Sequence, residues 1–316
     1  MPIQYIARYS RERAPHPNGR SGSGQLSWTW HNETVALGLD RYGQGAPVLL
    51  LPALSSISTR REMRPLQERL SARYRTIAVD WPGFGDQPRP PLDWTPEACS
   101  AFLSFLLNSL MPHPHAIIAA GHAATYALKD VAGQPGYADR LVLIAPTWRG
   151  PLPTMMAGHR PFFDRLCRLV DRPIVGPLVY RLNVNRFVVR RMGAGHVYSV
   201  AKFLDSERLA EKLKVVRAPG ARFSSVRFVT GRLDPAHSRE EFLDYARRAG
   251  VPILVVYGAE TPSRSRSEIE ALASLPGVRS IVLARGKLSI HEEFPDATFE
   301  AITPFLSEGV GAGPQR

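Results

Sequence analysis

The chain has 316 residues, of which 44% are hydrophobic and 22% charged, values typical of a globular protein with one large domain or two smaller ones. It is basic, since 40 Lys and Arg residues against 28 Asp and Glu give a formal net charge of +12. These values exclude a disordered or collagen-like chain, and no apolar run is long enough to predict a membrane-spanning helix.

The two cysteines are too few for a disulfide framework or a thiolate metal site, and the first residues lack the apolar core of a secretory signal. We therefore expect a cytoplasmic protein. Because the arginines are spread along the chain without a nucleic-acid-binding motif, we expect no nucleic-acid partner. We also expect no metal and no cofactor.

The first half of the chain alternates short apolar runs with helical periodicity, which is typical of a mostly parallel sheet with helices on both faces. A flexible basic leader is predicted over residues 1–24. The predicted strands are residues 26–30, 35–39, 48–51, 76–80, 116–120 and 141–145, the first two forming a hairpin. The predicted helices of this half are residues 62–73, 96–110 and 123–131.

After residue 146 the alternation stops, and residues 147–237 show no clear buried strand before 226–230. Alternation then resumes, with helices predicted at 238–249, 265–274 and 297–306 and strands at 253–257 and 280–284. This pattern predicts one core, residues 25–146 and 238–307, interrupted by an insertion at 147–237. A flexible tail is predicted over residues 308–316.

Six short motifs follow one another along the chain: LLLP (49–52), DWPGFGD (80–86), AAGHA (119–123), LIAP (143–146), VVYG (255–258) and HEEFP (291–295). In this order and spacing they resemble the α/β-hydrolase superfamily over about residues 25–307. The resemblance implies an α/β-hydrolase fold, with a mostly parallel twisted sheet, helices on both faces and a helical cap inserted at 147–237.

The residues that carry catalysis in this family are altered here. The resemblance implies a serine within G-x-S-x-G, on a sharp turn from strand to helix. The matching stretch GHAAT (121–125) places Ala123 at the nucleophile position. The acid position corresponds to Thr261, and Lys287 or Leu288 stands where the base histidine belongs. We therefore predict a degenerate catalytic triad.

Three residues are candidate substitutes. His291 is a candidate base, Glu260 is a candidate acid if its loop is displaced by one residue, and Ser55 is a candidate nucleophile near the mouth of the site. The alternative interpretations are structural. His291 then has a supporting role, and residues 58–59 cap the helix that follows.

Two further polar residues resemble parts of a catalytic site. His122 adjoins the expected turn, and we predict that it packs below it. Asp234 imitates an acid loop, but we predict that it ends the insertion and starts a turn.

A pocket is expected under the cap. Backbone amides at Ala124 and near Ala53 or Leu54 are predicted to point into it and to bind a carbonyl or carboxylate oxygen. Trp148 is expected either to face this pocket or to anchor the cap on the core.

Three hypotheses for function follow. The first is a non-catalytic or non-standard binder of a small apolar molecule with a carbonyl or carboxylate group. The second is an active hydrolase or lyase that acts on an ester-like substrate with displaced residues. The third is a membrane-surface or interaction protein, in which the apolar and arginine-rich segment 173–189 makes weak contact with an anionic membrane.

Overall fold

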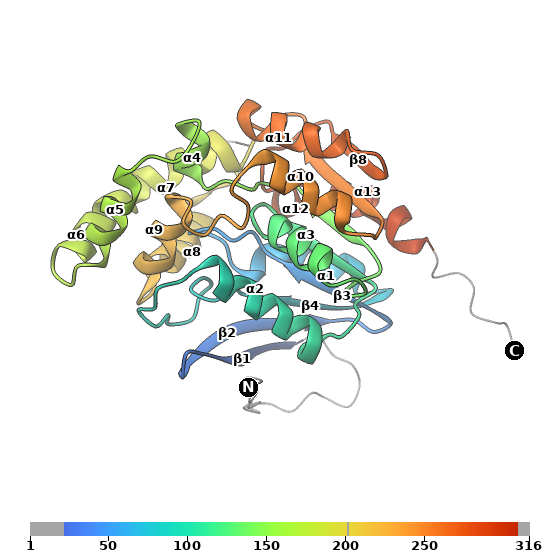
Figure 1. Cartoon of the computed structure of the whole chain (residues 1–316), viewed down its shortest axis with the longest axis horizontal. Helices are drawn as coiled ribbons and strands as arrows, with labels where there is room; N and C mark the ends of the chain where they lie inside the picture. The colour runs from blue at the N-terminus through green and yellow to red at the C-terminus, as the bar shows by residue number, and fades with distance from the viewer. Residues whose placement is uncertain (1–21, 201, 309–316) are drawn as a thin grey trace, which may run out of the picture.

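The computed structural model describes residues 22–200 and 202–308, and Figure 1 shows their arrangement. One eight-stranded sheet has the order β1-β2-β4-β3-β5-β6-β7-β8. The two pairings of β2, with β1 and with β4, are antiparallel, and all others are parallel. The strands are β1 Gly22–Trp30, β2 Glu33–Tyr42, β3 Ala46–Leu51, β4 Tyr74–Val79, β5 Ala116–Ala120, β6 Leu141–Ile144, β7 Ile253–Gly258 and β8 Val278–Leu283.

Helices cover both faces of this sheet. Since side chains alternate along a strand, the central strands divide their apolar residues between two clusters. One cluster joins Leu49, Ile117 and Leu143 to α2 (Pro96–Phe105), α3 (Ala123–Gly133), α10 (Arg239–Arg248) and α11 (Ser263–Ala273). The other joins Val48 and Ile118 to α1 (Arg64–Leu70) and α13 (Pro295–Ser307). Burial of both faces explains why β5 and β6 are wholly apolar.

The segment between β6 and α10 is helical in the described residues. It contains α4 (Pro151–Met155), α5 (Phe162–Asp171), α6 (Val175–Asn183), α7 (Arg186–Met192), the short π-helix η3 (Gly193–Val197), α8 (Ser206–Val216) and α9 (Ala221–Val229). We refer to these as the inserted helices. In Figure 1, α5 and α6 form the end of the molecule that is farthest from the sheet.

The strand predicted at 226–230 is wrong, because these residues belong to α9 and the turn after it. Their valines, phenylalanine and threonine favour a strand in isolation. However, α9 is packed against α4, α5, α6 and α8, so side chains on several sides of it are buried, Arg227 among them. Tertiary packing therefore overrides the local preference.

The other predicted strands and helices of the core overlap observed ones. β1 begins at Gly22, inside the segment 1–24 predicted as a leader, while residues 1–21 and 309–316 lie outside the described residues. In the described part of the chain, no helix has the length and hydropathy needed to cross a bilayer.

The DWPGFGD motif fixes the loop that follows β3. Arg60 lies at the start of the short 3-10 helix η1 (Arg60–Met63), and its guanidinium is 2.7 Å from Asp80 and 2.9 Å from Asp86. It also contacts Asp40 at 3.1 Å and is almost fully buried. This network holds the residues between β3 and α1 against the carboxyl end of the sheet.

Candidate functional site

The turn after β5 is made by Gly121. β5 ends at Ala120, Gly121 has a φ of +54°, and α3 begins two residues later at Ala123. In the family, the nucleophile occupies this sharp turn from strand to helix. Ala123, expected at the turn from the sequence, thus lies two residues beyond it, and the residue at the turn has no side chain.

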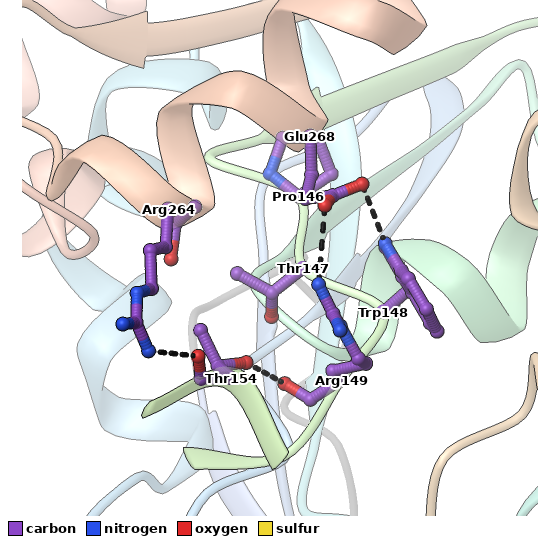
Figure 2. Close-up of a pocket in the computed structure, with 8 residues that line it drawn as sticks. Pro146, Thr147, Trp148, Arg149, Thr154, Arg264 and Glu268 are labelled. Carbon is purple, nitrogen blue, oxygen red and sulfur yellow. Dashed lines mark hydrogen bonds and ion pairs between the residues drawn. The ribbon is translucent and has the colours of Figure 1, made fainter. Parts of the chain in front are cut away.

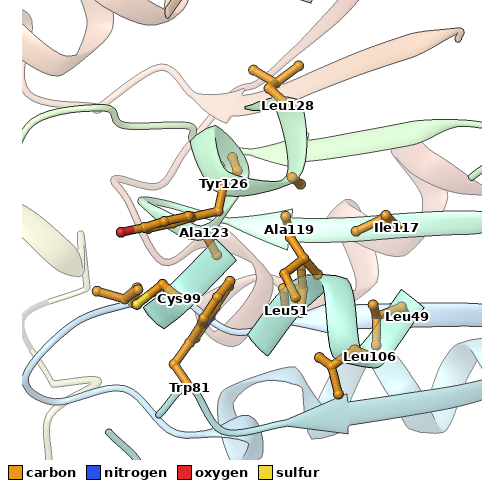
Figure 3. Packing of buried hydrophobic residues seen from close by; sticks show 14 of the residues in the cluster. Leu49, Leu51, Trp81, Cys99, Leu106, Ile117, Ala119, Ala123, Tyr126 and Leu128 are labelled. Carbon is orange, nitrogen blue, oxygen red and sulfur yellow. The ribbon is translucent and has the colours of Figure 1, made fainter. Parts of the chain in front are cut away.

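Ala123 is instead part of the core. It is completely buried in the cluster that includes Trp81, Cys99 and Tyr126, as Figure 3 shows. The amide of Ala124, expected to face a pocket, donates to the carbonyl oxygen of Gly121 at 3.2 Å because the first turn of α3 uses it. The position directly after the turn is His122.

The side-chain carboxylate of Glu62 binds a backbone amide of the loop after β3. The amide of Ala53 donates to Glu62 Oε1 at 2.6 Å, and Leu54 is buried in the core. Ser55 Oγ lies 2.9 Å from Ser58 Oγ. Thr59 caps η1, as its side chain accepts from the amide of Arg61 at 3.2 Å. Ser55 is therefore engaged within its own loop.

His291 lies beside the same carboxylate. It is carried by the short helix α12 (Ile290–Glu293), and its Nε2 is 3.3 Å from Glu62 Oε1. Both side chains are almost fully buried. No local pattern in the sequence predicts this contact, because Glu62 and His291 are 229 positions apart.

The residues at the expected acid and base positions make contacts that are unrelated to a catalytic triad. Glu260 is exposed and accepts from the amide of Gly286 at 2.8 Å, which lowers its pKa. Thr261 is buried, with its hydroxyl 3.5 Å from the carbonyl oxygen of Lys287. Lys287 Nζ donates to the carbonyl oxygen of Ala194 at 2.6 Å, while Leu288 is half-buried. The structure therefore does not bring Glu260 to His291.

A largely buried polar cluster joins the inserted helices to the loop of His291. Glu292 accepts from Lys212 Nζ at 3.0 Å, from Tyr198 Oη at 2.7 Å and from Ser289 Oγ at 3.3 Å. We call these four residues the Glu292 cluster. Burial alone would lower the pKa of Lys212, but the charge of Glu292 raises it above its ordinary value. Burial alone would raise the pKa of Glu292, but Lys212 lowers it.

His122 makes a second buried pair. Its Nε2 lies 3.0 Å from the carbonyl oxygen of Leu233 and 3.3 Å from Asp234 Oδ1. Asp234 also accepts from the amide of Gly150 at 2.8 Å, and burial raises its pKa. Gly150 precedes α4 and Asp234 follows α9, so this pair holds both ends of the inserted helices beside the turn.

Trp148 lies where the inserted segment leaves the core. Its Nε1 donates to Glu268 at 3.0 Å, and Glu268 also contacts Arg149 at 3.1 Å, as Figure 2 shows. Arg239 completes the contacts of Glu268 at 2.8 Å. The adjacent hollow has a volume of about 10 Å³, so it has room for about one water molecule rather than a ligand.

These contacts limit the chemistry of the site. Within residues 22–200 and 202–308, no Ser, Thr or Cys side chain hydrogen-bonds to His122 or His291. The arrangement offers two features. The backbone amide of Ala53 binds a carboxylate oxygen, and His291 lies beside the carboxylate of Glu62. It offers no nucleophile activated by a base.

The family model described as "Alpha/beta hydrolase family" matches residues 48–301. The chain therefore belongs to the alpha/beta hydrolase family.

Several known proteins resemble the chain. Two pimeloyl-(acyl-carrier protein) methyl ester esterases are each 24% identical to it, one from Legionella pneumophila and one from Aeromonas salmonicida. The first alignment covers 62% of this chain and 79% of the relative, and the second covers 86% and 100%. A thermophilic esterase from Thermogutta terrifontis has a similar fold, with a TM-score of 0.66 and 19% identity over 91% of this chain and 98% of that one.

Proposed function

We propose that this member of the alpha/beta hydrolase family does not perform serine-type hydrolysis and instead binds a small, largely apolar molecule with a carbonyl or carboxylate group. The observation that carries the proposal is Gly121 at the turn after β5, with a φ of +54° and no side chain. A serine triad acts as a unit, and loss of its serine costs about a millionfold in turnover in a protease. Thr261 and Leu288 are consistent with the loss of the triad, because neither side chain can act as the acid or the base at its position.

The contact between Ala53 and Glu62 supports the choice of ligand chemistry. A carboxylate oxygen already lies 2.6 Å from the Ala53 amide, so the loop after β3 accepts the charge and shape of that group. A ligand carboxylate or carbonyl would displace Glu62 Oε1 from this amide, and because the same oxygen lies 3.3 Å from His291 Nε2, the contact with His291 would change as well.

A second candidate is ester hydrolysis, which the names of the two esterase relatives favour. In this reaction His291, oriented by Glu62, would take a proton from a water molecule as its oxygen attacks the ester carbonyl. The 3.3 Å contact between His291 Nε2 and Glu62 Oε1 is the geometry that this reaction would use.

One experiment separates the two functions. We expect no hydrolysis of a chromogenic butyrate ester above the buffer rate, and a rise in melting temperature with butyrate or octanoate. Saturable turnover that His291→Ala abolishes would overturn the proposal in favour of the esterase.

A pair of variants tests the site. Glu62→Ala removes the internal carboxylate and is expected to tighten carboxylate binding about tenfold, since a charged hydrogen bond contributes about 1.5–3 kcal/mol. Glu260→Gln alters an exposed carboxylate of a neighbouring loop and is the matched control. If no carboxylate or ester changes the melting temperature of the parent chain or of Glu62→Ala, the chain binds no such ligand here.

A further inference from the structure

The exposed apolar side chains are concentrated on the inserted helices. Of the twelve large apolar side chains that are exposed in the described residues, ten lie between residues 155 and 192 and two lie on β8. The ten are Met155, Met156, Phe162, Leu169, Ile174, Val175, Leu178, Leu182, Phe187 and Met192. Exposed apolar groups gathered in this way mark an interaction surface rather than ordinary scatter.

Helix α6 shows the pattern most clearly. Ile174, Leu178 and Leu182 follow one another at intervals of four residues and therefore lie on one side of the helix. They are 87%, 62% and 65% exposed, while Tyr180 of the same helix bonds to the carbonyl oxygen of Val216 on α8. Packing within the chain therefore uses one side of α6 and leaves its apolar side uncovered.

The same segment is strongly basic. Residues 155–192 contain eight arginines and two aspartates, with no lysine or glutamate. Both aspartates are paired with arginines from outside the segment, Asp164 with Arg232 and Asp171 with Arg227. The exposed arginines without an acidic partner in the described residues are Arg160, Arg165, Arg168, Arg172, Arg181, Arg186, Arg190 and Arg191. We call these arginines and the ten apolar side chains the basic apolar face.

A hollow at one side of this face suits a phosphate group. It has a volume of about 260 Å³ and is lined by Arg186, Arg190 and Lys202, together with residues just before α8 and in its first turn. Arg186 and Arg190 are four residues apart on α7, so both guanidinium groups reach the same side. The acidic residue of the lining, Asp205, is occupied by the amide of Arg208 at 2.9 Å and by its guanidinium at 3.0 Å.

We propose that the basic apolar face docks on the surface of a bilayer that contains anionic phospholipids. Apolar side chains of α5, α6 and α7 enter the boundary between headgroups and acyl chains, and the arginines bind the phosphates. Figure 1 shows α5 and α6 at the end of the molecule that is far from the sheet. A second copy of the chain fits this face less well, because a two-fold contact would place eight arginines against eight arginines.

Vesicle flotation tests the proposal with the full chain. We expect the chain to float with vesicles of equal parts phosphatidylcholine and phosphatidylglycerol, and to float much less with phosphatidylcholine alone. High salt is expected to weaken the binding, since the attraction of the arginines is screened.

Two pairs of variants separate the apolar and the charged contributions. Leu178→Ser with Leu182→Ser removes apolar contact and keeps the charge, and its control is Ile281→Ser with Val282→Ser on β8. Arg181→Gln, Arg186→Gln and Arg190→Gln together remove charge, and their control is Arg73→Gln, Arg75→Gln and Arg247→Gln. Each variant of the face is expected to weaken binding about tenfold or more, and each control less than about twofold.

Four results would overturn the proposal. They are no flotation with anionic vesicles at low salt, equal losses in the charge variant and its control, no loss in the Leu178 and Leu182 variant, and a dimer in solution that this same variant dissociates. The last result would assign the face to a second copy of the chain.

Discussion

At the scale of single residues, the position of one turn decides how the site is interpreted. The letters GHA suggest Gly121 as the first glycine of a family motif and Ala123 as its nucleophile position. The structure shows that β5 ends at Ala120, so the turn falls on Gly121 and Ala123 packs into the core. The apolar run 116–120 indicated this position, because it ends directly before Gly121, the residue type that most readily adopts a positive φ.

Restoring a triad tests this position. We expect Gly121→Ser with Thr261→Asp and Leu288→His to raise hydrolysis of a chromogenic ester about a hundredfold, since a positioned base contributes at least that factor. A side chain at Gly121 would meet Ala53, with Cβ at 3.3 Å and Cα at 3.9 Å, so there is room after a small shift. The φ of +54° makes a serine there strained, as is typical of functional turns. The control carries Ala123→Ser in place of Gly121→Ser and is expected to stay inactive, because Ala123 is fully buried. If only the control variant with Ala123→Ser is active, the assignment of the turn to Gly121 is wrong.

At the scale of elements, periodicity predicted most strands and helices of the core but not the contacts between distant loops. The apolar runs of β3, β5, β6 and β7 are buried on both faces, so their composition alone indicates strands. The contact between Lys212 of α8 and Glu292 of α12 joins residues 80 positions apart, and no local pattern records it. The same limit explains why residues 226–230, at the end of α9 and in the turn after it, are predicted as a strand from the sequence.

The Glu292 cluster is expected to stabilise the attachment of α8 to the core. Lys212→Met leaves the largely buried Glu292 without its cation and should lower the free energy of unfolding by about 3 kcal/mol. Lys212→Met combined with Glu292→Leu removes both charges and should recover most of that loss. Urea unfolding measures both variants, and a double variant no more stable than Lys212→Met would show that the pair is not what links these elements.

The same pair predicts a dependence on pH. Because Lys212 lowers the pKa of Glu292 below its ordinary 4.5, the ionised carboxylate stabilises the folded chain above about that pH. The contribution is lost as pH falls through the lowered pKa, when the carboxylate becomes protonated in the folded chain too. The stability difference between the parent chain and Glu292→Gln should therefore shrink as the pH falls below about 4.5 toward the lowered pKa. A difference that stays constant over this range would contradict the prediction.

At the scale of the whole molecule, charge and exposed apolar surface are gathered at one end. The sequence shows a net charge of +12 and arginines along its whole length, which alone indicate a basic surface of no particular direction. The fold places eight arginines and ten exposed apolar side chains together on the inserted helices. Only the arrangement of α5, α6 and α7 shows which of these side chains share a surface.

The absence of serine-type catalysis is the central claim, and chemical labelling tests it most directly. The folded chain is incubated with a reactive fluorophosphonate beside an active serine hydrolase, and the mass of each intact protein is measured. We predict no adduct on this chain, because Gly121 offers no hydroxyl and no other hydroxyl bonds to a histidine in the described residues. A single stoichiometric adduct, placed by peptide mapping on Ser55 or another hydroxyl, would contradict the claim and establish a displaced nucleophile.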